Sequence, residues 1–365
     1  MYSAGTPAHV QSIYGQLVTS SSLKWIRSGT GVPLPDSAVH SGTNSGVVCR
    51  GRHHGTNVVG ATGGLGGAFC KAGFANRLVP LRNFEVLTQV PGAVKLIWKN
   101  FTRFSVPVHG CVAGVDGDNQ PIYIARRLEA SGDLVPAVVE IPVASYGTGL
   151  IKVYTDHSVE DVEEGEVLVE VEPVRYRLHL HRFDQSPKES QKRQTLASSS
   201  IFRFLEGKKT TARMQKMLSY TYVASEYYSH VAGTVKGLPV EIKLPSGEVK
   251  SRLWGMRDTR KQTESIMVGF DMQQNSAVDV RVVCDSIKLE QPFSGTLVAV
   301  FPDGSERTRQ VEGSMVLESL QNIRPEYSKL YQIKEKVMIS QARNFPTELD
   351  QVFIIVIYIL PKYNF

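Results

Sequence analysis

The side chains that could carry chemistry are few and lie far apart in this sequence. His179 and His181 occupy positions i and i+2 of an alternating segment, a spacing that could ligate a metal ion. No third ligand is nearby, so the spacing favours an exposed strand face. The glycines of residues 61–67 (ATGGLGG) lack the Lys-Ser/Thr pair and the helix that complete a phosphate loop, which indicates a flexible β loop. We therefore expect no metal and no cofactor.

The motifs of common enzyme classes are also missing. The sequence contains no G-x-S-x-G, no Walker-type phosphate loop, no G-x-G-x-x-G at a strand–helix junction and no H-E-x-x-H. We expect a protein that is not an enzyme and that acts by binding.

Composition is that of an ordinary globular protein with a slight basic excess. Of 365 residues, 42% are hydrophobic and 21% are charged, and the chain has room for two or three domains. The formal net charge of +6 suits contact with anionic surfaces without identifying one. Nothing in this diffuse charge predicts a nucleic-acid partner.

Cysteine usage and the first residues bear on the cellular location. The four cysteines (Cys49, Cys70, Cys111 and Cys284) show no C-x-x-C spacing and predict neither a zinc site nor a dense disulfide framework. Cys49 and Cys70 could pair within one domain, but free buried thiols are the interpretation we favour. The first residues, MYSAGTPAHV, lack the basic and apolar regions of a secretory signal. We expect a cytoplasmic protein by default, with release by a non-classical route as the alternative and membrane association when oligomeric.

Two segments of the first half resemble each other and indicate an all-β unit that occurs twice. Trp25 aligns with Trp98, and each copy ends on an acidic-apolar strand, residues 84–87 and 165–169. Short strands separated by Gly, Asn and Pro are typical of all-β units, and each tryptophan is expected to fill the core of its unit. We expect a flexible arm or at most one short helix over 1–22, then copies at about 23–92 and 93–173.

The second copy carries a resemblance to a known family. Its segment VPVHGCVAGVDGDNQPIYIARRLEASGDLVP resembles the DM-nine repeats, small all-β lectin-like modules that occur in tandem, some of which bind mannose-type sugars. The resemblance implies a sugar site at the acidic position of the A-G-x-D stretch. An Asp or Asn in a Gly-rich loop could bind sugar hydroxyls or could stabilise its own turn. The implied carbohydrate-binding residues are Asp116, its counterpart Asn44, and the aligned arginines Arg126 and Arg52.

Long alternating segments dominate the second half. Residues 174–183 (VRYRLHLHRF) and 220–254 alternate with period two, which predicts two-faced strands. The second segment is expected to turn back at residues 236–239, or alternatively at 245–247, and so to form a hairpin. Most of our functional expectations concern this hairpin.

Residues from about 175 to 331 are similar to the pore-forming module of natterin-like and other aerolysin-type toxins. The similarity lies in the arrangement of the long strand, the hairpin and a following strand pattern, matched here by Phe270, Val278, Val280, Val282, Lys288, Pro292, Phe293 and Gly295. A DM-nine pair followed by such a module is the order found in natterin-like proteins. The resemblance implies self-association into a ring and insertion of a hairpin into a lipid membrane.

Together these observations predict an all-β chain. A compact tandem-repeat lectin-like β domain is expected before an elongated aerolysin-like twisted β-sheet domain at 174–335, with a tail of unassigned role at 336–365. The favoured function is a pore-forming, toxin-like or innate-defence protein that recognises a surface glycan; the alternative is a non-lytic recognition protein of the same architecture. The expected membrane-inserting residues are Tyr222, Val223, Ser225, Tyr227, Ser229, Val231, Val235, Val240, Ile242 and Leu244.

Overall fold

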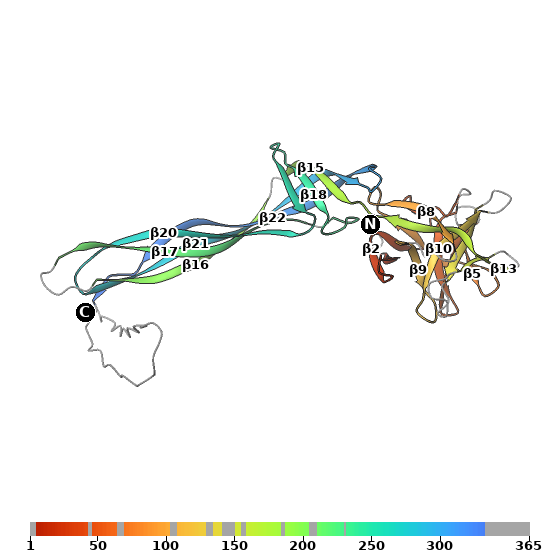
Figure 1. Cartoon of the computed structure of the whole chain (residues 1–365), viewed down its shortest axis with the longest axis horizontal. Helices are drawn as coiled ribbons and strands as arrows, with labels where there is room; N and C mark the ends of the chain where they lie inside the picture. Colours follow the sequence, from red (N-terminus) through yellow and green to blue (C-terminus); the bar gives the residue numbers. More distant parts are fainter. Residues whose placement is uncertain are drawn as a thin grey trace, which may run out of the picture. The chain divides into compact units, whose positions relative to one another are not determined.

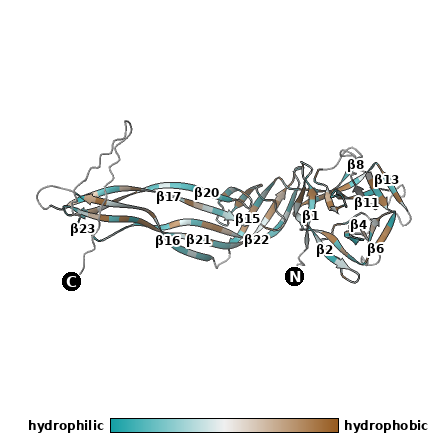
Figure 2. Cartoon of the chain, turned by 90° about the horizontal axis from the view of Figure 1, so that it is seen from below, coloured by the Kyte–Doolittle hydropathy of each residue, from teal (hydrophilic) through white to brown (hydrophobic). Residues whose placement is uncertain are grey.

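The computed structural model contains only β-strands as regular elements over the residues that it describes. These are residues 5–42, 46–63, 69–102, 108–128, 134–140, 150–154, 158–183, 187–203, 210–229 and 231–332. The all-β prediction is therefore confirmed. Contacts divide the chain into a first unit (1–185, 228–256 and 292–314) and a second unit (186–227, 257–291 and 315–365). Figure 2 shows hydrophilic and hydrophobic residues interspersed along the strands of both.

A 14-stranded sheet makes up most of the first unit. Its strands are β1 (Thr6–Gln11), β2 (Leu17–Gly29), β3 (Val48–His53), β4 (Thr56–Gly63), β5 (Phe69–Phe74), β6 (Arg77–Leu81), β7 (Asn83–Gln89), β8 (Lys95–Thr102), β9 (Cys111–Val115), β10 (Pro121–Leu128), β11 (Leu134–Glu140), β12 (Leu150–Tyr154), β13 (Val159–Val162) and β14 (Glu164–Val171).

One strand order occurs twice in this sheet. The first copy runs β2-β7-β3-β4-β5-β6, and the second runs β8-β14-β10-β11-β12-β13. Trp25 pairs with Leu87 in the first copy, as Trp98 pairs with Leu168 in the second. Trp25 is fully buried in an apolar cluster, and Trp98 packs against the same cluster. The repeat that the sequence predicts thus appears as the same register of strands around equivalent tryptophans.

The N-terminal residues differ from the arm or short helix expected for 1–22. Residues 6–11 form β1, which pairs with β2 on one side and with β9 on the other, and β2 begins at Leu17. Ala8 and Val10 are 2% and 3% exposed. Their period-two alternation lies within a polar, Ser- and Thr-rich stretch, and the partner strand β9 is about one hundred residues away, so the local pattern did not reveal the strand.

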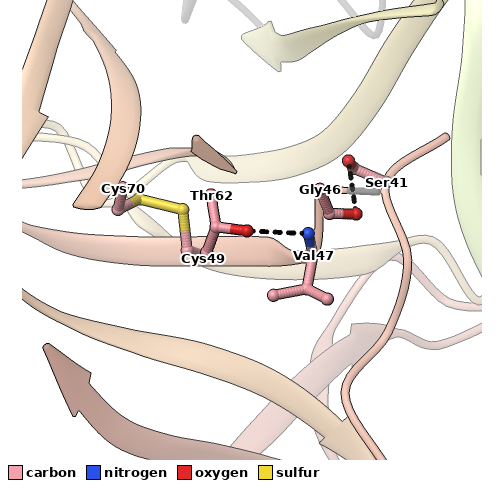
Figure 3. The surroundings of a disulfide bond; sticks show 6 residues. All are labelled: Ser41, Gly46, Val47, Cys49, Thr62 and Cys70. Atoms are coloured by element: carbon pink, nitrogen blue, oxygen red, sulfur yellow. Dashed lines mark hydrogen bonds between the residues drawn. A yellow bond between two sulfur atoms is a disulfide. The ribbon is translucent and has the colours of Figure 1, made fainter. Parts of the chain in front are cut away.

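A disulfide joins β3 to β5 across the intervening strand β4 (Figure 3). Cys49 and Cys70 are bonded and their Cα atoms lie 6.0 Å apart. In a flat sheet, strands two places apart are separated by roughly 10 Å, so the sheet folds sharply at β4. Gly60 permits the fold, because a Cβ there would lie 1.8 Å from the carbonyl oxygen of Lys71. The expectation of free thiols was wrong for this pair, whereas Cys111 and Cys284 are free and buried.

The remaining strands form a nine-stranded sheet that contributes to both units. They are β15 (Arg175–Phe183), β16 (Lys188–Arg203), β17 (Ala212–Tyr228), β18 (Pro239–Lys243), β19 (Val249–Leu253), β20 (Arg257–Met272), β21 (Ser276–Val300), β22 (Glu306–Tyr327) and β23 (Tyr331–Gln332). Within the second unit, the long strands β16, β17, β20 and β21 run side by side (Figure 1). An apolar cluster from these four strands forms the core of the second unit.

In this fold, residues 222–244 do not pair with one another as a single hairpin. β17 ends at Tyr228 and pairs with β20, while β18 pairs with β19 and runs parallel to β15. The turn at Pro245-Ser246-Gly247, which the sequence offered as an alternative, connects β18 to β19, with Gly247 at a φ of 90°. Alternation continues past Tyr228 in the sequence, but the backbone does not remain in the ladder there.

Specific contacts hold residues 233–235, which follow the end of β17. The Thr234 hydroxyl accepts a hydrogen bond from the Trp254 indole N–H at 2.8 Å, and the Tyr176 hydroxyl accepts one from the backbone N–H of Val235 at 2.9 Å. Gly233 has a φ of 74° and leaves no room for a Cβ against Val90. These contacts hold residues 233–235 outside the β17–β20 ladder, although the sequence continues to alternate there.

Candidate functional site

An arginine stacked on the buried tryptophan organises one face of the first copy. The guanidinium of Arg50 lies 4.3 Å from the ring centroid of Trp25, and its Nε donates to Glu85 at 2.8 Å. Its Nη1 donates to the carbonyl of Ala113 at 2.6 Å. Burial lowers the pKa of Arg50, and the bond and charge of Glu85 act in the opposite direction. Because an arginine stays protonated in proteins, this is a fixed, half-buried ion pair.

The second copy repeats this arrangement. Arg126 lies 4.3 Å from the ring centroid of Trp98, and its Nε donates to Glu166 at 2.6 Å. Strand register makes the copies equivalent, since Arg50 pairs with Glu85 as Arg126 pairs with Glu166. A Trp–Arg–Glu set that recurs in both copies with the same geometry is a structural part of the module.

The structure therefore changes one pairing proposed from the sequence. The counterpart of Arg126 is Arg50, two residues before Arg52. The sequence alignment matched the dipeptide Gly51-Arg52 to Ala125-Arg126, because glycine and alanine look alike at that position. Glu85 distinguishes Arg50 from Arg52, because it bonds Arg50, and it lies 35 residues further along the chain. No local pattern could reveal it.

A polar groove lies beside this set in the first copy. It has a volume of about 710 Å³ and is lined by Arg27, Ser28, Arg50, Gly51, Arg52, Asn57, Asn83, Phe84 and Glu85. The residues come from four neighbouring strands in the order β2-β7-β3-β4. In register, Arg27, Glu85 and Arg50 form one row across the sheet. Such a row shares one face, because paired residues project to the same side.

The three described residues among those implied in sugar binding, Arg52, Arg126 and Asp116, do not gather at one site. Arg52 lines the groove, and Arg126 is held by Glu166. Asn44 lies outside the described residues. The Oδ1 atom of Asp116 accepts hydrogen bonds from the backbone N–H groups of Asp118 at 2.9 Å and Gln120 at 2.8 Å, which is the turn geometry that the sequence allowed.

Three further groove residues, Arg27, Asn57 and Asn83, were not identified from the sequence. Arg27 stands two residues after Trp25 and therefore on the same face of β2. That spacing is the only local signal. The groove itself results from pairing β2, β7, β3 and β4, whose order is not the order of the sequence.

The histidine pair behaves as an exposed strand face. His179 and His181 are exposed on β15, and His181 Nε2 lies 2.6 Å from the Thr296 hydroxyl, a hydrogen-bonding distance. Over the described part of the chain, no group of three or more His, Cys, Asp or Glu side chains could hold a metal ion.

A buried carboxyl group lies elsewhere in the first unit, on β14. Glu170 is 1% exposed, and its Oε1 accepts a hydrogen bond from the Ser20 hydroxyl at 2.9 Å. Burial is the main cause that raises its pKa to about 7; the Ser20 bond opposes this rise, and the charge of Glu172 adds to it. The group therefore changes protonation near neutral pH.

The second unit presents a two-faced ribbon formed by β17 and β20. Their ladder runs from the pair Ala212–Met272 to the pair Tyr227–Arg257. The outer face carries cross-strand hydroxyl pairs, Ser219–Ser265 at 2.9 Å and Thr221–Thr263 at 3.0 Å. The inner face carries mainly apolar side chains of the core cluster, including Met214, Leu218, Tyr220, Tyr222, Ile266, Val268 and Phe270.

The residues expected in the inserting hairpin are divided among several elements. Four of them, Tyr222, Val223, Ser225 and Tyr227, lie on β17 of the second unit. Ser229, Val231 and Val235 follow β17, Val240 and Ile242 lie on β18, and Leu244 directly follows β18. Among the residues described, no helix is long and apolar enough to cross a membrane.

Comparison with known proteins gives partial likenesses. No protein-family model matches the chain. The sequence is 26% identical over 361 residues to Protein unzipped of Drosophila melanogaster, covering 93% of this chain and 72% of that protein.

Three solved structures are similar in part. Lamprey immune protein matches with a TM-score of 0.39 and 8% identity, over 84% of this chain and 98% of that one. The parasporin-2 toxin of Bacillus thuringiensis matches with a TM-score of 0.29 and 13% identity, over 57% and 86%. The nematode sperm cell motility protein MFP2B matches with a TM-score of 0.30 and 11% identity, over 80% and 96%. Since all three TM-scores are below 0.5, the fold assignment rests on the strands of this chain, an all-β protein with a duplicated unit.

Proposed function

We propose that this chain recognises a surface glycan through the groove of its first copy. The observation that carries the proposal is the polar lining of that groove, where guanidinium and amide groups of Arg52, Asn57 and Asn83 project beside the Glu85 carboxylate. These groups offer the donors and acceptors that vicinal hydroxyls require. Sites for apolar ligands are lined mostly by hydrophobic side chains, and this groove has a polar lining. A saccharide matches it better than an apolar ligand.

A glycan array with the full chain tests this proposal. We expect binding that Asn83→Ala weakens, because the exposed Asn83 side chain lines the groove. Asp116→Ala is the comparison, since Asp116 supports a turn. Loss of binding with Asp116→Ala and not with Asn83→Ala would move the site to the turn. No binding to any glycan would end the proposal.

We also propose that the second unit acts on membranes after self-association, which would make the chain a pore-forming defence protein. The β17–β20 ribbon supports this second function. Strands of about 9–11 residues suffice to cross the apolar core of a bilayer, and β17 has 17 residues and β20 has 16. The ribbon also has two different faces, as crossing a bilayer requires. The inner face is mainly apolar, and the outer face carries the Ser and Thr pairs beside the exposed Met217, Val223 and Met267.

Vesicle leakage separates this proposal from the non-lytic alternative. Tyr222→Lys places a charge on the face that would meet lipid, where it costs roughly 2–4 kcal/mol. We expect it to abolish leakage, while Ser219→Lys on the hydroxyl face leaves leakage largely unchanged. Circular dichroism checks that both variants fold. If the wild-type protein causes no leakage from vesicles and forms no rings, the non-lytic alternative is favoured.

One observation favours that alternative. Lys216 and Glu264 share the inner face of the ribbon with the apolar side chains, and ionised groups are costly in lipid. Glu264 accepts hydrogen bonds from the hydroxyls of Tyr220 and Tyr222 at 3.0 and 2.9 Å. These bonds join β17 to β20 within the ribbon, and the carboxylate of Glu264 would have to enter lipid with them.

The disulfide supports a proposal about location. Structural disulfides persist in oxidising compartments and are rare in the cytosol. We therefore propose that the folded protein resides in an oxidising compartment, in place of the cytoplasmic location expected by default. Fractionation of cells with thiol labelling of Cys49 and Cys70 tests this, since labelling without prior reduction would contradict it.

A further inference from the structure

The two copies of the module differ in charge at equivalent positions of the groove face. Arg27 pairs with Glu85 in the first copy, whereas Asn100 pairs with Glu166 in the second. Arg50 and Arg126 are equivalent, so that Arg52 corresponds to Leu128, two residues further along each strand. The Trp–Arg–Glu set is common to both copies. The additional arginines belong to the first copy alone.

Neighbouring positions strengthen this contrast. Asn83 stands two residues before Glu85, and the residue two before Glu166 is Glu164. The groove of the first copy therefore has three arginines and one glutamate, and the equivalent face of the second copy has one arginine and two glutamates. Duplication provides an internal comparison, because a feature required by the fold would be expected in both copies.

The extra arginines carry uncompensated charge. Glu85 is already engaged by Arg50 and by the Thr6 hydroxyl at 3.1 Å. Arg27 and Arg52 are exposed, and within the described ranges no ion pair or side-chain hydrogen bond holds either of them. An exposed arginine is stable in water without a partner, and its guanidinium can bind a carboxylate or sulfate group through two parallel hydrogen bonds. The groove thus has two guanidinium groups available to a ligand.

We propose that the groove binds an anionic saccharide, one that carries sulfate or carboxylate groups as well as hydroxyls. This rests on the proposed glycan recognition and names its substrate class. Arg27 on β2 and Arg52 on β3 are separated by β7, so the two strands lie roughly 10 Å apart, and Arg52 is offset by two residues along β3. Glu85 stands between those two strands. The charge pattern is positive, negative, positive, which suits a ligand with separated anionic groups.

A compact phosphate fits this pattern less well. A single dianion at the centre of the groove would approach the Glu85 carboxylate, and the volume of about 710 Å³ exceeds what one phosphate needs. Asn57 and Asn83 offer neutral donors and acceptors to the hydroxyl groups that a saccharide has between its charges. The lining therefore favours a charged oligosaccharide over a lipid headgroup.

Titration calorimetry with the full chain tests the inference. The probes are a sulfated heparin-derived tetrasaccharide, its desulfated counterpart, and vesicles containing a phosphoinositide. We expect the sulfated probe to bind and the desulfated one to bind at least about tenfold more weakly. The double variant Arg27→Ala/Arg52→Ala should lower affinity for the sulfated probe by about a hundredfold, since each charge-assisted contact contributes roughly tenfold.

Arg77→Ala/Arg82→Ala is the matched control. Both arginines are exposed, neither lines the groove, and the variant loses the same net charge. It should bind the sulfated probe like the wild type. That result would distinguish binding in the groove from nonspecific electrostatic attraction of the probe to a basic protein. Equal losses in both double variants would overturn the inference.

The remaining outcomes separate this inference from the proposed function. Equal affinity for sulfated and desulfated probes would overturn the anionic class and leave glycan recognition standing. Binding of the phosphoinositide vesicles through Arg27 and Arg52, without saccharide binding, would identify a lipid headgroup and contradict both. Absence of binding to every saccharide on an array and in solution would also contradict both.

Discussion

Two kinds of buried or half-buried charge occur in the first unit, and they have different consequences. The Arg50–Glu85 and Arg126–Glu166 pairs are compensated and sit against tryptophan rings. Glu170 has only the Ser20 hydroxyl as a side-chain partner among the described residues, and its Oε2 atom is buried without one. An ionised carboxylate in such a place is costly. The protonated form is favoured in the folded state.

Glu170 should make stability fall as the pH rises. Its pKa is about 7 in the folded state against an ordinary value of 4.5, so the folded state binds the proton more tightly. The stabilising effect is complete below about pH 4.5 and is lost as the pH rises to about 7, a change of roughly 3 kcal/mol. Glu170→Gln, which resembles the protonated group, should therefore be more stable than the wild type at about pH 8 and similar at about pH 5.

Urea unfolding at those two pH values measures the effect. Glu164→Gln is a suitable control, because Glu164 is exposed on the same strand. An unchanged slope of stability against pH in Glu170→Gln would show that another group is responsible. His109, Cys111 and Glu172 are the ionisable neighbours that act on this cluster.

At the scale of elements, the disulfide and Gly60 determine how the sheet folds over at β4. The covalent bond closes a loop with a sequence separation of 21 residues. Loops of this size restrict the unfolded chain and stabilise the folded state by about 3 kcal/mol. Cys49→Ala/Cys70→Ala should lower the free energy of unfolding by about that amount, as measured by urea titration. Wild-type protein treated with a reductant should behave like the variant, and equal stability of all three samples would contradict the prediction.

Elements with a local pattern could be predicted from the sequence, and those that depend on distant partners could not. The all-β class and the burial of Trp25 followed from period-two alternation and from the repeat. β1 was missed because its own six residues have little strand pattern. It is stabilised by pairing with β2 and β9, which lie elsewhere in the sequence. Residues 222–244 do not pair as one hairpin in this fold, because β17 pairs with β20 and Thr234 is bonded to Trp254, although the sequence continues to alternate. Which residues enter a membrane stays a prediction.

The candidate site shows the same division. Arg52 was identified, through an alignment that the structure then shifted to Arg50. Arg27, Asn57 and Asn83 were missed because they become neighbours only when four strands pair in the order β2-β7-β3-β4. Register across strands has no signal in a single sequence unless a repeat exposes it. Here the repeat exposed both tryptophans and Arg126, but not Arg50, the arginine partner of Trp25.

At the scale of the whole molecule, β1 joins the two copies of the module. His9 pairs with Thr19 of the first copy and with Val112 of the second. Removing residues 1–12 should expose the facing edges of β2 and β9 and uncover the apolar cluster that Ala8 and Val10 complete. We expect the truncated chain to unfold at a lower temperature, by several degrees, and to aggregate through its open edges.

Calorimetry and light scattering check this outcome. Ala8→Ser/Val10→Ser provides a milder variant that keeps the strand but weakens its apolar contacts. Its melting temperature should lie between those of the truncated and the complete chain. Identical melting of the truncated and complete chains would show that β1 is dispensable.

The position of β1 between two strands from different copies also bears on how the chain reaches its fold. Its ladder with β9 joins residues about one hundred positions apart, and such long-range pairings form slowly because a large loop must close first. Each copy can complete its own local ladders earlier. The join made by β1 should therefore be among the last to form in the first unit, and an intermediate with two folded copies and an open edge is the species in which one chain could take up the β1 strand of another.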